Sequence, residues 1–306
     1  MSKVLILLST YNGELYIREQ IESLLNQKGV DITILVRDDQ SNDRTVEILQ
    51  EFEKKTGKII LIKGTNCGAC NSFLKLMEEA SKSINSYNYF AFCDQDDVWL
   101  EDKLMAAIEI LENSKNKNIP SLYMSAYQMV DVDLKEIKTP VRTPLLSVPT
   151  ALASNCATGC TMVFNSVLLA DVIGYRGEDI LMHDYWTYLV CLVKGGCVYY
   201  DPIPHILYRQ HGNNVIGGRG DSFFKRWYLR FKKIFRQGDN FKSKLANILI
   251  SQYGNQMSLN DYRFLENLRT SKKLSSKFYI LMCNEFWSVG FDCKIKNLGL
   301  LLTGKI

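Results

Sequence analysis

The first hundred residues alternate between short apolar runs and longer segments with helical periodicity. Runs of a strand's length lie at residues 3–8, 32–36, 58–63 and 89–93. Apolar runs this short, rich in β-branched and aromatic residues, are typical of strands buried on both faces. The segments with helical spacing cover about residues 15–25, 44–55 and 72–83. Strands that alternate with helices predict an α/β fold with an open, mostly parallel sheet and right-handed crossovers.

Polar clusters follow three of these strands. They are Ser9 to Asn12, Asp38 to Asp43 and Asp94 to Asp97. Because parallel strands bring their carboxyl ends onto one rim of a sheet, we expect these clusters to form one ligand site. The glycine motifs of dinucleotide and P-loop sites do not occur, which disfavours both classes. We expect the first two clusters to hold a nucleotide and the third to hold metal and phosphate.

The third cluster contains three carboxylates directly after a strand, those of Asp94, Asp96 and Asp97. Like charges this close repel one another, and a hard divalent cation with oxygen ligands relieves the repulsion and attracts substrate phosphates. The alternative is a solvated acidic turn that caps the helix starting near Leu100. Because short motifs match by chance, the tripeptide alone favours this alternative, and the metal interpretation depends on the rest of the chain.

Composition limits the class of protein. The chain has 306 residues, 46% of them hydrophobic and 23% charged, enough for a full core in one large domain or a domain with an appendage. No run approaches the roughly 18 apolar residues of a membrane helix, and the start lacks a signal-peptide pattern, so we expect a cytoplasmic protein. The nine cysteines include one Cys-x-x-Cys pair, Cys67 and Cys70, and we expect them to be reduced and mostly buried.

The net charge of +4 is unevenly distributed. The window from Lys225 to Lys244 holds eight Lys or Arg residues and one acid, a net charge of +7 that leaves −3 elsewhere. Aromatic residues such as Trp227 and Phe231 recur among these charges at three-to-four spacing, which predicts a basic amphipathic helix that could lie on an anionic membrane. The alternative is a helix whose aromatics pack on the catalytic domain and whose basic side is solvated. The pattern supports both equally, and we expect no nucleic-acid partner.

The motifs, taken in order, resemble family-2 glycosyltransferases of the GT-A fold. The resemblance rests on Ser9-Thr-Tyr-Asn12, Arg37-Asp-Asp-Gln-Ser-Asn-Asp43 and Asp94-Gln-Asp-Asp-Val-Trp99, which are modest alone and specific together. Later pieces look most like the rhamnosyltransferase branch, which serves capsule, O-antigen and wall polysaccharide synthesis. These pieces are Thr158-Gly-Cys160, His183-Asp-Tyr-Trp186 and Tyr208-Arg-Gln-His-Gly-Asn-Asn214.

The resemblance implies a domain organisation. A GT-A catalytic domain would cover residues 1–220, with a Rossmann-like nucleotide-sugar-binding half at 1–100 and an acceptor-binding half at 101–220. Beyond the resemblance, the spacing of basic and apolar residues predicts a basic, mostly helical region at 221–306, of which the part from residue 245 would cover the core or form a homodimer contact. From about Phe223 onward no specific resemblance is found.

The family also implies donor-binding roles for individual positions. Thr10, Tyr11 and Asn12 would line the base pocket, and Asp39 would accept a hydrogen bond from the pyrimidine N3–H. Gln40 stands where the family usually has glycine, which would slightly alter the base pocket.

The acidic motif would hold the sugar diphosphate and its metal. Asp94, Gln95 and Asp96 would flank the diphosphate, with Asp96 as a ligand of Mg²⁺ or Mn²⁺. Arg209 and His211 could both meet phosphate oxygens, Arg209 as a fork and His211 as a neutral donor or metal ligand. For Arg209 an ion pair that closes the loop is an equally supported alternative.

On the acceptor side, Asp184 matches the family's catalytic base. Its alternative role is a helix N-cap, for which Asp is a preferred residue. His183 precedes it where many relatives have Glu, which leaves the assignment of the base less secure. The remaining positions expected to bind acceptor are Trp99, Gly159, Cys160, His183 and Trp186, with the Trp186 indole stacking on a sugar face. Gly159 could equally mark a tight turn, and Cys160 lacks a neighbour that would activate its thiol.

The resemblance implies a metal-dependent inverting transferase that moves L-rhamnose from dTDP-L-rhamnose onto a lipid-linked saccharide, at the inner face of the plasma membrane. A UDP-hexose donor is the first alternative, and a non-catalytic nucleotide-sugar-binding scaffold is the second. A phosphatase with an Asp-x-Asp nucleophile is disfavoured, because its carboxylates would follow the first strand, where this chain has Ser9 and Thr10.

Overall fold

The computed structural model describes residues 1–113, 118–138, 143–175, 180, 182–211 and 240–306. Its contacts divide the chain into two units. The first comprises Met1–Thr143, Ala157–Cys191 and Gly196–His211, and the second comprises Pro144–Cys156, Leu192–Gly195 and Gly212–Ile306. The functional division into donor and acceptor halves stays a prediction.

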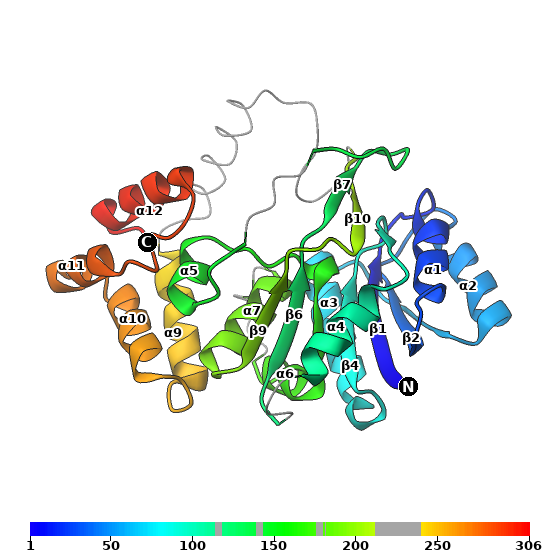
Figure 1. Cartoon of the computed structure of the whole chain (residues 1–306), viewed down its shortest axis with the longest axis horizontal. Helices are drawn as coiled ribbons and strands as arrows, with labels where there is room; N and C mark the ends of the chain where they lie inside the picture. The colour runs from blue at the N-terminus through cyan, green and yellow to red at the C-terminus, as the bar shows by residue number, and fades with distance from the viewer. Residues whose placement is uncertain (114–117, 139–142, 176–179, 181, 212–239) are drawn as a thin grey trace. The chain divides into compact units, whose positions relative to one another are not determined.

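A seven-stranded sheet forms the centre of the first unit (Figure 1). Its strands, in spatial order, are β3 (Ile59–Lys63), β2 (Val30–Asp38), β1 (Ser2–Thr10), β4 (Tyr89–Cys93), β8 (Val163–Asn165), β6 (Ser121–Ser125) and β9 (Cys197–Asp201). Strand β8 runs antiparallel to both of its neighbours, and the other paired strands are parallel. The predicted open, mostly parallel sheet is confirmed.

Helices cover both faces of this sheet. One face packs against α1 (Ile17–Leu25), α2 (Thr45–Thr56) and α4 (Lys103–Glu112). The other packs against α3 (Ala69–Ser81) and α6 (Ser166–Val172). Alternate residues of a strand point to opposite faces, so a strand buried on both faces is apolar throughout, as residues 4–8 of β1 are.

A three-stranded sheet lies beside the site and was not predicted from the sequence. Its strands are β5 (Val98–Trp99), β10 (Ile206–Arg209) and β7 (Gln128–Val130), with β10 in the middle. Strand β10 pairs antiparallel with β5 and parallel with β7. Because β5 directly follows the acidic motif, this pairing brings Arg209 and His211 to Asp96 and Asp97 across more than a hundred residues of sequence.

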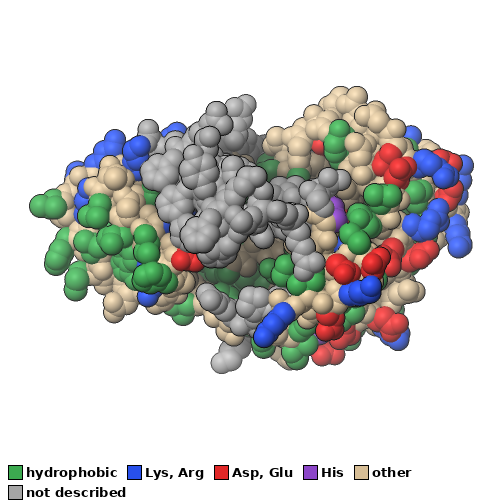
Figure 2. Space-filling model, turned by 90° about the horizontal axis from the view of Figure 1, so that it is seen from above, with side chains coloured by type: hydrophobic (Ala, Val, Ile, Leu, Met, Phe, Trp, Pro, Cys, Tyr) green, Lys and Arg blue, Asp and Glu red, His purple; other side chains and the backbone are tan. Residues whose placement is uncertain are grey.

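The second unit is helical, as expected for the C-terminal region. It contains α5 (Val148–Ala153), α9 (Phe241–Tyr253), α10 (Leu259–Arg269), α11 (Leu274–Met282) and α12 (Phe291–Thr303). Lys242 at the start of α9 is buried, and its Nζ donates to Asn297 Oδ1 of α12 at 2.6 Å. Figure 2 shows hydrophobic side chains gathered on the C-terminal helices, with lysines beside them.

The basic amphipathic helix predicted near 223–244 falls almost entirely outside the described residues. Of its window, only residues 240–244 are described, and they belong to the start of α9 and its N-cap. Within the part of the chain that the structure describes, no helix is both long and apolar enough to cross a membrane.

Candidate active site

The three polar clusters meet on one rim of the large sheet, at the carboxyl ends of β1, β2 and β4. The Thr10 hydroxyl donates to Asp38 Oδ1 at 3.1 Å, and the Asp39 N–H donates to the Thr10 carbonyl at 2.8 Å. The Gln95 side chain accepts from the Tyr11 N–H at 2.9 Å and donates to the Tyr11 carbonyl at 3.1 Å. Gln95 therefore holds the first and third clusters together through backbone contacts.

Asp39 is a buried, ionised acceptor at the floor of the predicted base pocket. Its Oδ2 accepts hydrogen bonds from the Cys67 and Gly68 N–H groups, both at 2.9 Å, and its Oδ1 pairs with Arg37. Burial alone would raise the pKa of Asp39, but the hydrogen bonds from Arg37 and from the Cys67 N–H outweigh burial and hold that pKa below its usual value. Asp39 therefore stays charged, and an ionised carboxylate can act only as an acceptor, which matches a pyrimidine N3–H donor.

Neighbouring residues shape the same pocket. Tyr11 is exposed, whereas Thr10 is buried behind it. Asn12 adopts a left-handed backbone conformation with φ of 49°, and its Oδ1 accepts from the Asn42 N–H at 2.9 Å. Arg37 was not given a role from the sequence, although it stands two residues before Asp39 in the quoted motif.

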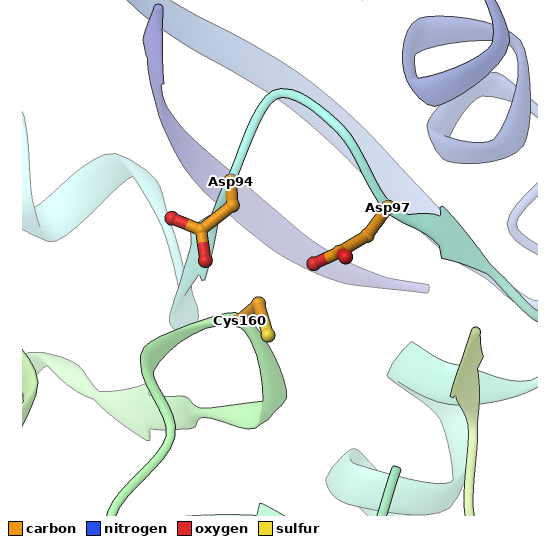
Figure 3. Close-up of side chains that lie close together, drawn as sticks. All are labelled: Asp94, Asp97 and Cys160. Atoms are coloured by element: carbon orange, nitrogen blue, oxygen red, sulfur yellow. The ribbon is translucent and has the colours of Figure 1, made fainter. Parts of the chain in front are cut away.

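The acidic motif folds into a turn between β4 and β5 that gathers its carboxylates. Ligand atoms of Asp94, Asp97 and Cys160 all lie within 4.8 Å of one another, and Figure 3 shows Asp94 and Asp97 on one turn with Cys160 on the segment that faces it. Burial, followed by the charge of Asp96, raises the pKa of both Asp94 and Asp97. Such carboxylates repel one another unless a proton or a cation compensates.

A second pair of candidate ligands lies beside this group, formed by Asp96 and by His211, which follows two residues after the end of β10. His211 Nε2 lies 2.7 Å from Asp96 Oδ2, and the imidazole stacks on Tyr16 with ring centroids 4.9 Å apart. The structure thus brings together Asp96 and His211, the two residues predicted as metal ligands.

This donor set fits a hard divalent cation. The carboxylate oxygens suit Mg²⁺ or Mn²⁺, whereas an imidazole is a ligand that transition metals prefer, so the His211 nitrogen favours Mn²⁺ over Mg²⁺. Among the described residues, Asp97 Oδ2 is buried without a hydrogen-bond partner, which leaves its lone pairs available. The Cys160 thiol does not fit a hard cation, because sulfur is a soft ligand that selects softer metals. Burial and the charges of Asp97 and Asp94 also raise the pKa of this thiol.

Lys103 lies beneath this group and was missed by sequence reasoning. Its side chain is fully buried, with Nζ 3.3 Å from the centre of the Trp99 ring. Burial lowers the pKa of Lys103 to about 8, partly opposed by the Cys93, Cys160 and Asp97 groups nearby. Its helical spacing with Ala107 and Leu111 was the signal that could have placed it on the buried face of its helix.

For Arg209, where phosphate contact and loop closure were equally supported, the contacts of the side chain favour loop closure. The side chain is 2% exposed; Nε donates to the Asp96 carbonyl at 2.9 Å and Nη1 to the Val132 carbonyl at 2.7 Å. Nη2 pairs with Glu19, and the guanidinium lies over the Tyr16 ring. Because its guanidinium nitrogens bind protein groups, Arg209 fixes the acidic turn and offers few donors to a ligand.

Asp184 lies in the first turn of α7 (His183–Val193), beside the acidic motif. Its Oδ2 accepts from the Gly159 N–H at 3.1 Å and its Oδ1 from the Tyr185 N–H at 2.7 Å. The negative charge of Asp184 contributes to the raised pKa of Asp94, which shows that the two carboxylates are electrostatic neighbours. The candidate base and the candidate metal site therefore occupy one region of the first unit.

Gly159 allows this arrangement. It opens the short 3-10 helix η2 (Gly159–Thr161) that also carries Cys160. A Cβ at this position would lie 3.0 Å from His183 Nε2 and 3.4 Å from Asp184 Cβ. A side chain there would press on the His183 ring next to the candidate base, so a close approach as well as a turn favours glycine at this position.

His183 packs in the core, which is not what was expected of a residue that binds acceptor. Its ring stacks on Phe73 with centroids 3.8 Å apart and meets the edge of Phe92. Among the described residues neither ring nitrogen has a hydrogen-bond partner. Burial, only partly opposed by the charge of Asp184, lowers the pKa of His183 to about 4.

We expect this buried imidazole to make stability depend on pH. An unfolded His has a pKa of about 6.5, so between about pH 6.5 and pH 4 the unfolded chain binds more protons and stability falls as the pH falls. The variant His183→Phe lacks this titration. As the pH falls from about 6.5 to about 4, its free energy of unfolding should therefore decrease less than that of the unmodified protein, by up to about 3 kcal/mol. Melting curves of both proteins at neutral pH and across that range measure the difference. Parallel loss in the two proteins would show that His183 titrates normally.

Both tryptophans expected to contact acceptor are buried. The Trp186 indole is covered by Tyr175, and its N–H donates to the Val172 carbonyl at 3.4 Å. Trp99 is covered by Lys103. Neither ring presents a face on which a sugar could stack, because aromatic surface of this size is more favourable in the core.

Comparison with known proteins agrees with this geometry. Residues 5–169 match the family model described as glycosyl transferase family 2. The chain is 31% identical to the dTDP-rhamnosyl transferase RfbG of Shigella flexneri over 297 residues, which cover 90% of this chain and 98% of RfbG. The chain belongs to glycosyl transferase family 2. This glycosyltransferase is also 28% identical to an Escherichia coli enzyme, WfaP, over 79% of this chain and 87% of WfaP.

Solved structures support the fold of the glycosyltransferase. The crystal structure of Staphylococcus aureus TarS 1-349 in complex with UDP-GlcNAc superposes with a TM-score of 0.61 at 15% sequence identity. The match covers 99% of this chain and 82% of the TarS chain. The predicted GT-A-type fold is confirmed.

Proposed function

We propose that this glycosyltransferase transfers L-rhamnose from dTDP-L-rhamnose to a lipid-linked saccharide during the synthesis of a surface polysaccharide. The assignment of the donor rests on one observation, the similarity to a dTDP-rhamnosyl transferase along nearly the whole length of both chains. A lipid-linked acceptor is supported by WfaP, whose name describes a glucosyltransferase acting on GlcNAc-diphosphoundecaprenol.

Each residue of the site then has a task. Asp39 would bind the nucleobase, and Asp94, Asp96 and His211 would hold a divalent cation, which when bound would neutralise charge on the leaving diphosphate. Asp184 takes the proton of the acceptor hydroxyl while the oxygen of that hydroxyl forms a bond to the anomeric carbon of the donor sugar. The bond from that carbon to the diphosphate breaks, and its electron pair stays on the phosphate oxygen. Attack from the side opposite the leaving group inverts the anomeric centre.

The donor assignment is tested by thermal stabilisation of the purified protein. A ligand at about a hundred times its dissociation constant stabilises a protein by roughly 2.7 kcal/mol. With Mn²⁺ present, we expect dTDP-L-rhamnose to give the largest shift of the unfolding midpoint, and chelation with EDTA to remove most of it. Transfer of radiolabelled rhamnose to a lipid extract then tests turnover.

A UDP-hexose donor is the second candidate, because the name of WfaP specifies UDP-Glc. Uracil and thymine present the same N3–H to Asp39, so the base pocket described here accepts either. A stabilisation led by a UDP-sugar would replace the donor and keep the reaction. Binding of nucleotide sugars without any transfer would support the scaffold alternative, and no shift with any of them would overturn both.

A further inference from the structure

Helix α11 of the second unit exposes one apolar face. The residues on this face follow the helical spacing i, i+4, i+7 and i+8: Leu274, Phe278, Leu281 and Met282. All four are exposed, Leu274 at 85% and Phe278 at 66%, whereas Ile280 on the opposite side is buried. The helix thus covers the second unit with its smaller side and turns its larger apolar side outward.

Helix α12 repeats the arrangement. Its exposed apolar residues follow the spacing i, i+4, i+7 and i+11: Phe291, Ile295, Leu298 and Leu302. Phe291 is 74% exposed, while Leu301 is buried. Two consecutive helices with outward apolar stripes exceed the single exposed hydrophobic residues that are normal on a protein surface.

The two stripes are adjacent within the second unit. Lys277 Nζ of α11 donates to the Leu302 carbonyl of α12 at 3.0 Å. The turn of α11 that carries Phe278 therefore lies next to the turn of α12 that carries Leu302. Green side chains gather over these helices at the left end of Figure 2, with blue ones beside them. We call the eight residues of the two stripes the α11/α12 face.

Lysines border this face. Lys277 and Lys294 each follow the first residue of their stripe by three positions, so both stand on the same side of it. Residues 272–305 contain six lysines and only two acids, Glu285 and Asp292. Lysine is depleted from protein–protein interfaces, whereas Phe, Leu and Ile bordered by lysine are typical of helices that lie in the interface of an anionic membrane.

We propose that the α11/α12 face docks on an anionic lipid surface, with the aromatic and aliphatic side chains below the headgroups and the lysines at the phosphates. The proposal rests on the proposed function in one respect: a lipid-linked acceptor lies in a bilayer, so the transferase must reach that surface. The docking face consists of residues of the second unit, whereas the residues proposed to bind the donor and the proposed general base, Asp184, belong to the first unit.

Vesicle flotation with the full chain tests the proposal. Vesicles of phosphatidylglycerol mixed with phosphatidylethanolamine should carry the protein upward, and added salt or vesicles of phosphatidylcholine alone should weaken binding. The double variant Phe278→Ser with Phe291→Ser should bind about tenfold more weakly or worse. The matched control, Leu259→Ser with Ile203→Ser, removes two exposed hydrophobic residues outside the face and should bind normally.

The outcomes separate this proposal from the proposed function. Equal flotation of the double variant and the unmodified protein would assign membrane binding to other residues and overturn the docking face. Absence of flotation, together with a change of oligomeric state in the double variant by light scattering, would make the face a protein contact and also overturn it. Thermal stabilisation by the donor is measured without vesicles. Absence of that stabilisation would therefore overturn the donor assignment and leave the docking face unaffected.

Discussion

Replacing Asp184 by Asn is expected to suppress sugar transfer by a factor on the order of 10² or more while leaving donor binding intact, as is typical when a general base is removed. Asn has nearly the shape of Asp and can still accept the hydrogen bond that Asp184 receives from the Gly159 N–H. It cannot accept the proton of the acceptor hydroxyl. The measurements are the transfer rate at saturating donor and the dissociation constant of the donor by calorimetry.

Two comparisons make this test specific. Asp133→Asn applies the same chemical change to an exposed carboxylate of the first unit and should leave both quantities unchanged. Glycine at position 159 is retained in both variants, so the approach of η2 to α7 is kept. Near-normal transfer by Asp184→Asn would move the base to another residue, and loss of donor binding would show that Asp184 acts on the donor site.

Replacing Asp96 by Asn should raise the Mn²⁺ concentration needed for half-maximal transfer by about ten- to a hundredfold or more, because even residues behind the metal ligands have effects of that size. Asp96 contacts His211 at 2.7 Å, and an Asn side chain can keep a hydrogen bond to that imidazole. What it loses is the negative charge that attracts the cation. Titration of Mn²⁺ by calorimetry, with a nucleoside diphosphate present, measures the affinity directly.

Asp97→Asn is the informative companion variant. Asp97 lies in the cluster with Asp94 and Cys160, and its Oδ1 accepts the Arg209 N–H at 3.1 Å. Should Asp97→Asn weaken Mn²⁺ binding while Asp96→Asn does not, the cation belongs to the Asp94 and Asp97 pair. Should neither variant change the metal dependence of transfer, the acidic motif would not be the metal site.

The sequence was sufficient to predict the large sheet and the rim on which the site lies. Local patterns carry this information: a short apolar run such as residues 3–8 is typical of a buried strand, and parallel strands end on the same side of a sheet. The polar clusters after β1, β2 and β4 therefore meet on one rim whatever the details of packing. The proximity of Asp96 and His211 was also expected, but only through the family resemblance.

Tertiary structure decided what each side chain of the site is free to do. The motifs of the family resemblance place Trp186, His183 and Arg209 near the site, but they do not show whether these side chains face it. Their burial is settled by long-range neighbours: Tyr175 and Val172 for Trp186, Phe73 for His183, and Glu19 and Val132 for Arg209.

The same holds for the outward faces of α11 and α12. Helical periodicity identifies an apolar stripe without showing whether it packs inward or faces solvent. Burial depends on which distant segments fill the space beside a side chain. The sequence by itself therefore determined the large sheet and the rim that carries the candidate site, and only the packing between distant segments decided which side chains of that site are buried.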